Sequence, residues 1–441
     1  MKKMFILVLA LVMTFAALPA FAQDKADWSF YGSVRMWTAW ESVDDDTPNQ
    51  LSNSGFFPVA ATTAKAIGYS VDGNQGDDEF AYLLQSNSRI GANVKWGNIG
   101  GRFEYGHTTT ANLRLLYGTW NFGAGTLLVG QDYGPYFYLV SGLCGPGGGE
   151  CNGIGFGSIY SGRNPQLKLI FGGLQIAMVK PAQVSSFAPS AALATALGGG
   201  APLTANSTIL QNNQTTNSKA TVATTVPVGT ATIDTGVNAA GFTDVDFTLP
   251  KLEASYTFNL GPAQLFFGGI YNKYTEVYNI GGVETENDVE GWALGAGTKM
   301  SFGPFYLNAT AQYGRNVNNS GSGPVTMFPT VQFYAPQAIP AAGIAAGDSE
   351  DADYMAAQLI LGFKLTDSMV FEGGVVWQNG EYDDVEQTTW VYYIGFGWSP
   401  AKNVFIVPEF GIIDYKKLET SSGDVGFGDL TWFGIKWQIN F

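Results

Sequence analysis

The chain of 441 residues carries 22 Lys and Arg against 37 Asp and Glu, which gives a formal net charge of −15. This acidic excess argues against nucleic acid as a partner, because a nucleic-acid-binding surface must neutralise phosphate charge. Aromatic residues make up 14% of the chain, and along much of it they alternate with Gly, Ser, Thr, Asn and Gln. The composition favours a wall with one apolar face and one polar face.

The first residues have the features of an export signal. Lys2 and Lys3 precede an apolar run, and an Ala-x-Ala sequence ends at Ala22. We predict a secretory signal peptide over residues 1–22 and a mature chain over residues 23–441. Since the signal holds two lysines and no acidic residue, the mature net charge is −17. No later stretch reaches the ~18 continuous apolar residues of a spanning helix, so a helical inner-membrane protein is not expected.

Strands account for most of the mature chain. We predict about sixteen, near residues 28–41, 79–97, 101–107, 112–122, 126–133, 158–172, 174–181, 248–260, 263–276, 289–302, 305–316, 352–366, 369–380, 387–398, 402–415 and 428–441. Short connections rich in Gly, Pro, Asn and Asp alternate with longer polar loops. With an even strand count, both termini and the short turns lie on one side, the periplasm, and the long loops face outward.

The last predicted strand has one apolar face and one polar face, as a wall between lipid and water requires. In steps of two from Phe441, one face carries Ile439, Trp437, Ile435 and Phe433, and the other face is mostly polar. Taken alone, the segment could be an edge strand of a soluble sandwich. In a bilayer, however, a strand must pair on both edges, so the repeated pattern predicts an all-β fold: a closed transmembrane antiparallel β-barrel.

Three predicted outer loops differ in composition. Residues 42–78 are acidic, residues 134–157 are rich in glycine, and residues 182–247 are a long low-complexity segment of Ala, Thr, Ser, Asn and Gly. The last of these is expected to be a flexible surface loop or a weakly ordered cap. Because export leads to an oxidising compartment, we expect Cys144 and Cys151 to form a disulfide. Two thiols and one His cannot complete a zinc shell, so neither metal nor cofactor is expected.

The run at residues 112–122, followed by Gly130-Gln131-Asp132-Tyr133-Gly134, resembles the general trimeric porins of the bacterial outer membrane. In that family a strand with an inward Arg is followed by a short strand and the pore-constricting third loop. The resemblance implies that the third outer loop folds into the lumen. It also implies a basic wall at three positions, Arg89, Arg114 and Arg163, for which the alternative is solvated wall arginines with little effect on selectivity.

The resemblance assigns two further sets of residues. Asp132 and Glu150 are the acidic residues placed on the constriction loop, although the acidic motif of the family is absent there. The terminal residues Phe441, Ile439 and Trp437 look like the signal read by the barrel-assembly machinery. The expected localisation is the outer membrane of a Gram-negative bacterium, in contact with lipid and lipopolysaccharide.

The predicted function is passive diffusion of small hydrophilic solutes and ions through a water-filled pore. One alternative is a substrate-selective channel in which Tyr31, Trp37 and Trp120 form an aromatic track. Another is a closed structural or adhesin barrel, suggested by residues 182–247. No enzymatic activity is expected, because the single His, His107, lies at the end of a strand beside three threonines.

The expected assembly is a homotrimer. Besides the family resemblance, small outward residues such as Ala309 and Ala311 would let barrel walls pack closely. The second outer loop, 107–112, is short, so residues 182–247 are expected to take part of its latching role. Acidic clusters such as Glu284, Glu286 and Asp288 are expected in outer loops, where they serve solubility or bridge divalent ions to anionic lipid.

Overall fold

The computed structural model describes residues 26–43, 79–85, 87–107, 111–141, 156–182, 244–280, 283–322, 330–334, 346–382, 385–419 and 429–441. Within these ranges, no helix is long and apolar enough to cross a membrane.

The described residues form twenty-three strands. The first twelve are β1 (Asp27–Val43), β2 (Glu79–Leu84), β3 (Arg89–Trp96), β4 (Ile99–His107), β5 (Ala111–Asn121), β6 (Thr126–Tyr133), β7 (Phe137–Tyr138), β8 (Ile159–Tyr160), β9 (Arg163–Phe171), β10 (Leu174–Val179), β11 (Asp244–Asp246) and β12 (Lys251–Leu260). The others are β13 (Ala263–Ile280), β14 (Val283–Phe302), β15 (Phe305–Arg315), β16 (Phe333–Tyr334), β17 (Ser349–Glu350), β18 (Asp353–Thr366), β19 (Met369–Tyr382), β20 (Val385–Ala401), β21 (Val404–Asp414), β22 (Leu418–Glu419) and β23 (Asp429–Asn440).

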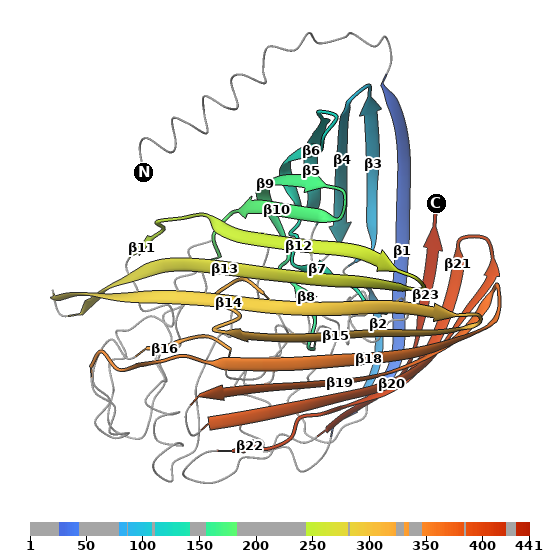
Figure 1. Ribbon diagram of the computed structural model, residues 1–441. Coiled ribbons are helices and arrows are strands. Elements are labelled where there is room, and N and C mark those ends of the chain that lie inside the picture. The colour runs from blue at the N-terminus through green and yellow to red at the C-terminus, as the bar shows by residue number, and fades with distance from the viewer. Residues whose placement is uncertain are drawn as a thin grey trace.

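Nineteen of these strands form one sheet, which closes on itself. Each strand of the wall pairs antiparallel with the next along the chain, and β23 pairs with β1. Three wall strands consist of two segments each, because β2 and β3 both pair with β1, β11 extends β12, and β22 extends β21. The described residues therefore form a closed sixteen-stranded barrel, which confirms the predicted fold (Figure 1).

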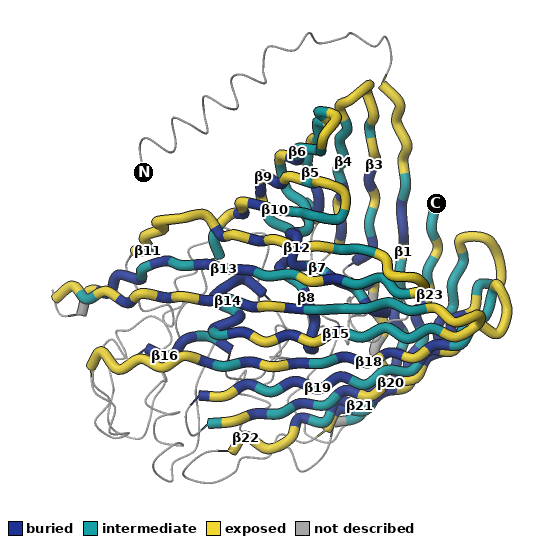
Figure 2. The backbone as a smooth tube through the Cα atoms, in the orientation of Figure 1, coloured by how far each residue is buried: buried dark blue, intermediate teal, exposed yellow. Residues whose placement is uncertain are grey.

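The two faces of the wall differ in the way that the sequence predicts. Along β23, Phe433, Trp437 and Ile439 are exposed on the outside, whereas Gly434 and Lys436 are buried on the inside. The same alternation of buried and exposed residues runs along the other wall strands (Figure 2). Such an outer surface is stable against lipid chains, because a soluble protein rarely exposes so much contiguous apolar area.

A bulge interrupts the second wall strand, which the sequence predicted as continuous from 79 to 97. Met36 pairs with Leu84 and Ser33 pairs with Arg89, so four residues of this strand oppose two residues of β1. The backbone of Arg35 holds the bulge, since its carbonyl accepts a hydrogen bond from Gln85 N (2.8 Å) and its N–H donates to Ser88 Oγ (2.9 Å). Bulges of this kind bend a strand and re-aim its side chains.

Glycines make room for tryptophans where the barrel closes. A Cβ atom on Gly434 would lie 2.2 Å from Cζ2 of Trp37, and one on Gly411 would lie 2.1 Å from Cζ2 of Trp432. Both indoles are fully buried. Glycine is therefore required at both positions to leave room for the large rings on the inner wall.

Several predicted boundaries were wrong. β13 and β14 continue to Ile280 and Val283, so the acidic residues 284, 286 and 288 lie on a strand and not in a loop. The strand predicted at 158–172 begins at Arg163, and residues 159–160 form β8 instead. Of the loop predicted at 182–247, only residue 182 and residues 244–247 lie in the described ranges, and three of them form β11. Local alternation cannot locate these ends, because strand pairing beyond the membrane depends on the partner strand.

Candidate functional site

The third outer loop leaves β6, enters the barrel and contacts the opposite wall. Its described parts are residues 134–141 and 156–162. Strand β7 in the first part pairs with strand β8 in the second. The backbone N–H of Tyr136 donates to Glu253 Oε2 on β12 (3.1 Å), and its hydroxyl donates to Gln312 Oε1 on β15 (3.0 Å). In Figure 1, β7 and β8 lie behind the strands β12 to β14, inside the wall.

Further contacts extend across the ring. Gly157 N–H donates to Gln378 Oε1 on β19 (2.9 Å), and the hydroxyl of Ser141 donates to Glu372 on the same strand. The ring of Phe156 lies 6.1 Å from that of Tyr415, just beyond β21. The loop thus spans the lumen from β6 to β21, which confirms the predicted inward fold. Residues Cys144, Glu150 and Cys151 lie outside the described ranges, so their assignments stay predictions.

Acidic side chains of the inner wall hold the loop in place. Glu253 accepts a second hydrogen bond from Ser161 Oγ (2.8 Å) and forms an ion pair with Lys251 (3.0 Å). Glu372 also accepts hydrogen bonds from the hydroxyls of Tyr306 (2.7 Å) and Tyr393 (3.1 Å). Both carboxylates are nearly inaccessible to solvent. Their charge is therefore directed at the loop and the adjacent wall.

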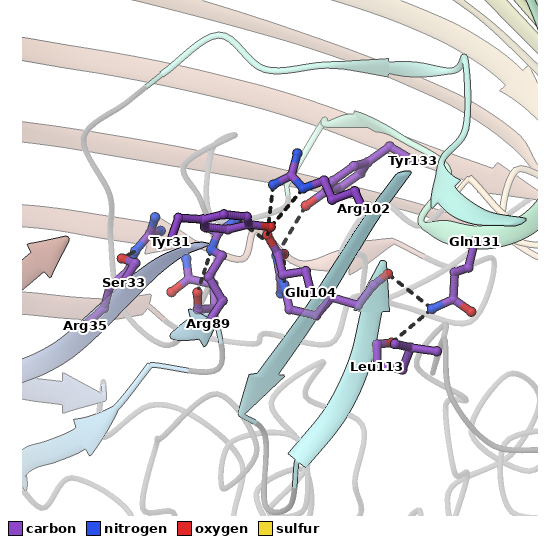
Figure 3. Close-up of polar contacts among 11 residues, drawn as sticks. Tyr31, Ser33, Arg35, Arg89, Arg102, Glu104, Leu113, Gln131 and Tyr133 are labelled. Carbon is purple, nitrogen blue, oxygen red and sulfur yellow. Dashed lines mark hydrogen bonds and ion pairs between the residues drawn. The ribbon is translucent and has the colours of Figure 1, made fainter. Parts of the chain in front are cut away.

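The facing wall, formed by the first strands, carries a cluster of arginines around Glu104 (Figure 3). The Nε of Arg114 on β5 donates to Glu104 Oε1 at 2.6 Å, and an Nη of Arg102 on β4 donates to Oε2 at 3.0 Å. Arg89 on β3 lies 3.7 Å from Oε1. Arg35 on β1 adds a fourth guanidinium beside the group and donates to Ser33 Oγ at 3.0 Å. We call Arg35, Arg89, Arg102 and Arg114 the arginine cluster.

Strand geometry explains this convergence. Arg102 and Glu104 are two residues apart on β4 and therefore share the inner face. Arg114 is an extra residue on β5, because Glu104 pairs with Leu115 whereas Tyr105 pairs with Leu113. Glycine at 106 leaves room for it: a Cβ atom there would lie 2.4 Å from Arg114 Cδ.

Tyrosines connect the cluster to the strands on either side. The hydroxyl of Tyr31 on β1 donates to Glu104 Oε2 (2.8 Å) and accepts from Arg102 Nε (2.8 Å). The hydroxyl of Tyr133 at the end of β6 accepts from Arg114 (3.2 Å). Arg163 at the start of β9 lies over the Tyr133 ring, 5.7 Å from its centroid. Arg89, Arg114 and Arg163, the three predicted basic residues, therefore lie on one side of the lumen.

The exposure of these side chains decides which charge a solute meets. The side chain of Glu104 is 0% exposed, whereas those of Arg114, Arg89 and Arg102 are 6%, 12% and 32% exposed. One carboxylate cannot neutralise four guanidinium groups, and it is the group most completely covered. The arginine cluster therefore presents net positive charge to the lumen.

Three of the predicted placements need correction. Asp132 does not lie on the loop: it is part of β6, where its carboxylate pairs with Lys168 Nζ at 2.7 Å. Trp37 faces inward but is 0% exposed, so no solute can slide along it. Trp120 pairs with Ile99, which is exposed on the outer surface, so Trp120 shares that face. Two members of the predicted aromatic track are thus unavailable to the lumen.

Sequence reasoning missed Arg35, Arg102 and Glu104. A signal was present on β4, since Arg102 and Glu104 alternate with Phe103 and Tyr105, the pattern of a strand with polar side chains facing inward. The convergence itself could not be read from the sequence, because it depends on the strand register and on the extra residue at Arg114.

Comparisons with known proteins place this architecture among outer-membrane channels. No family model matches the sequence, and no curated protein matches it. Among solved structures, the outer membrane channel DcaP of Acinetobacter baumannii is similar with a TM-score of 0.57 and 16% identity, over 96% of this chain and 100% of that chain. The anion-selective porin from Comamonas acidovorans gives a TM-score of 0.51 and 10% identity over 95% and 100%.

A third similar structure is the trimer form of OmpT, an outer membrane protein of Vibrio cholerae, with a TM-score of 0.50 and 11% identity over 95% of this chain and 100% of that chain. These similarities show that the chain has the sixteen-stranded fold of outer-membrane channels and porins.

Proposed function

We propose that the protein is a porin of the outer membrane, a passive channel for small hydrophilic solutes and ions, and that its pore prefers anions. The observation that carries the preference is the arginine cluster around a single covered carboxylate, Glu104. Fixed charge at a narrow point raises the local concentration of counter-ions and lowers that of co-ions. The pore thus prefers anions although the chain as a whole carries a net negative charge.

The third loop supports this reading by the way it divides the lumen. Inner-wall carboxylates such as Glu253 and Glu372 bond to the loop and to the wall beside it. The arginine cluster lies on the other side of the loop. A solute that passes between the loop and β1 to β5 therefore meets guanidinium groups and few accessible carboxylates. Similarity in fold to a channel named as anion-selective agrees with this expectation but says nothing about individual residues.

The test is a reversal potential measured in a KCl gradient across a planar bilayer that contains the purified protein. We expect a potential of the sign that chloride permeation produces. Neutralising Arg89, Arg114 and Arg163 together with Gln should move the potential toward the potassium value. An unchanged potential in this triple variant would refute the constriction assignment, and absence of any conductance would refute the channel itself.

We also propose how the protein is exported, inserted into the membrane and assembled. Residues 1–22 would be removed on export, the barrel would be inserted by the barrel-assembly machinery, and the outer loops would contact lipopolysaccharide. We propose no catalytic activity for the barrel. A homotrimer is supported by outward small residues such as Ala311 and by the trimer form of the similar Vibrio protein. The mass of the native protein in detergent tests it, and a monomer would contradict it.

A further inference from the structure

The third loop has two chemically different faces. On β7 and the residue before it, Tyr136 and Tyr138 are buried against the wall, where Tyr136 bonds to Gln312 and Tyr138 stacks on Phe266 at 4.7 Å. Phe137 and Tyr138 are consecutive residues of β7, so the ring of Phe137 points to the side opposite Tyr138. It is only half-buried. The Phe137 ring therefore points away from the wall that Tyr136 and Tyr138 contact.

The returning strand repeats this arrangement. Ile159 on β8 is fully buried, and a Cβ atom on Gly295 of the wall would lie 2.7 Å from its Cδ1. Its neighbour Tyr160 is half-buried and pairs with Phe137 across the hairpin. Paired residues of a hairpin share a face. Phe137 and Tyr160 therefore belong to the same surface of the loop, the one directed toward the arginines.

Tyr133 joins these two residues to form an aromatic cluster. Its ring is stacked on Phe137 with a centroid distance of 4.6 Å and an interplanar angle of 15°, and it lies 6.3 Å from Tyr160. Phe137 and Tyr160 are in edge contact at 5.7 Å. All three rings are half-buried, so part of each is accessible. We call Tyr133, Phe137 and Tyr160 the aromatic cluster.

Cationic groups lie directly against this cluster. The guanidinium of Arg163 is 5.7 Å from the centroid of the Tyr133 ring, and an Nη of Arg114 donates to the Tyr133 hydroxyl at 3.2 Å. The described segments of the loop, residues 134–141 and 156–162, contain no acidic residue. A solute at this point thus meets flat ring surfaces and guanidinium groups together.

We propose that the aromatic cluster and Arg163 form a binding subsite for aromatic carboxylates, anions in which a carboxylate is attached to a planar ring. This inference rests on the proposed function, because it assigns a preferred solute to the same pore. The ring of the solute would stack on Phe137 or Tyr160, and its carboxylate would bond to guanidinium groups. A saturated ring of equal charge and similar size cannot stack in this way.

The experiment compares benzoate with cyclohexanecarboxylate, both of which are ionised at neutral pH. Each is titrated onto single channels of the complete protein in KCl, and the apparent Kd is taken from the concentration dependence of current block. We expect benzoate to bind about threefold to tenfold more tightly, the range that aromatic pairing supplies. Equal Kd values for the two anions would overturn the proposal.

Variants locate the effect. In Phe137→Leu and in Tyr160→Leu we expect the ratio of the two Kd values to fall toward one, because leucine keeps apolar volume but has no ring face. The matched control is Phe371→Leu on the outer surface of β19, which should keep the wild-type ratio. A ratio unchanged in both loop variants would overturn the assignment of the subsite.

Two further results are distinguishable. If one loop variant fails to fold, the other loop variant and the two Kd values of the wild-type protein still test the subsite. If the KCl reversal potential shows a preference for potassium while benzoate still blocks more tightly than its saturated analogue, the proposed anion preference fails and the subsite stands.

Discussion

The Nε atom of Arg114 lies 2.6 Å from Oε1 of Glu104, and the two side chains come from neighbouring strands and are both covered. Three other guanidinium groups surround the same carboxylate or lie beside it. Without Glu104 these cations would repel one another at short range. The single carboxylate therefore has a structural role, holding together a group of charges that acts on the solute.

Replacing Glu104 with Gln tests that role. Breaking a buried ion pair by removing one partner costs about 3–5 kcal/mol, and we expect a loss near the lower end because Arg102 remains open to solvent. Anion preference should increase at the same time, since one negative charge is removed. Urea unfolding in lipid vesicles and the KCl reversal potential measure the two effects. Glu276→Gln is the control, because Glu276 is buried but bonds to Tyr278 and Asn287.

The arginines of the cluster should contribute unequally. The side chain of Arg102 is 32% exposed and that of Arg114 only 6%. We expect Arg102→Gln to move the reversal potential further toward potassium, because its charge is the more accessible to ions. Arg114→Gln should lower stability more, since it removes the closest partner of Glu104. Equal shifts of the reversal potential in both variants would argue against exposure as the determinant.

Loss of a loop anchor should make the pore unsteady. Glu372 accepts hydrogen bonds from Ser141 of the loop and from Tyr306 and Tyr393 of the wall. In Glu372→Ala we expect noisier single-channel current and closure at lower voltage, because the loop loses this attachment. Glu276→Ala removes a buried carboxylate that bonds to Tyr278 and Asn287 of the wall, and it should leave the noise unchanged. Quiet channels in Glu372→Ala would show that the remaining anchors suffice.

A methyl group at the closing seam should be harmful. A Cβ atom on Gly434 would lie 2.2 Å from Trp37, so Gly434→Ala forces the indole to move. Overpacking of this kind typically costs about 1–3 kcal/mol. The control is Gly373→Ala on β19, where the nearest atom would be 3.4 Å away, an ordinary contact. A lower urea midpoint for Gly434→Ala alone is the expected result, and equal midpoints would contradict it.

Much of the fold could be predicted from the sequence because lipid and water impose a period of two on every wall strand. The order of the strands, the outward face of β23 and the inward third loop all follow from that alternation and from the porin resemblance. The bulge between Leu84 and Arg89 escaped prediction because the strand keeps the same alternation on both sides of it.

Less of the candidate site than of the fold could be predicted from the sequence. Arg89, Arg114 and Arg163 were placed by resemblance, and the structure brings them to one side of the lumen. The sequence and the resemblance predict acidic residues on the loop, at Asp132 and Glu150. Among the described residues, the carboxylate that contacts the arginines is Glu104 on the wall strand β4. The sequence analysis places Trp120 in the lumen, but Trp120 pairs with Ile99 and therefore faces outward. This pairing depends on the strand register, which the sequence alone does not reveal.

The fit of Trp37 over Gly434 also bears on how the ring closes. Ser33 of β1 pairs with Asn440 of β23, near the two ends of the described chain, whereas most wall strands pair with a sequence neighbour. Contacts of such long range form slowly, so closure is expected to be the final event of folding. A slip by one residue would turn the apolar face of β23 inward. A slip by two would bring Trp432 or Lys436 to the place of Gly434, where a bulky side chain would meet the indole. The glycine thus selects the one register in which first and last strands can join.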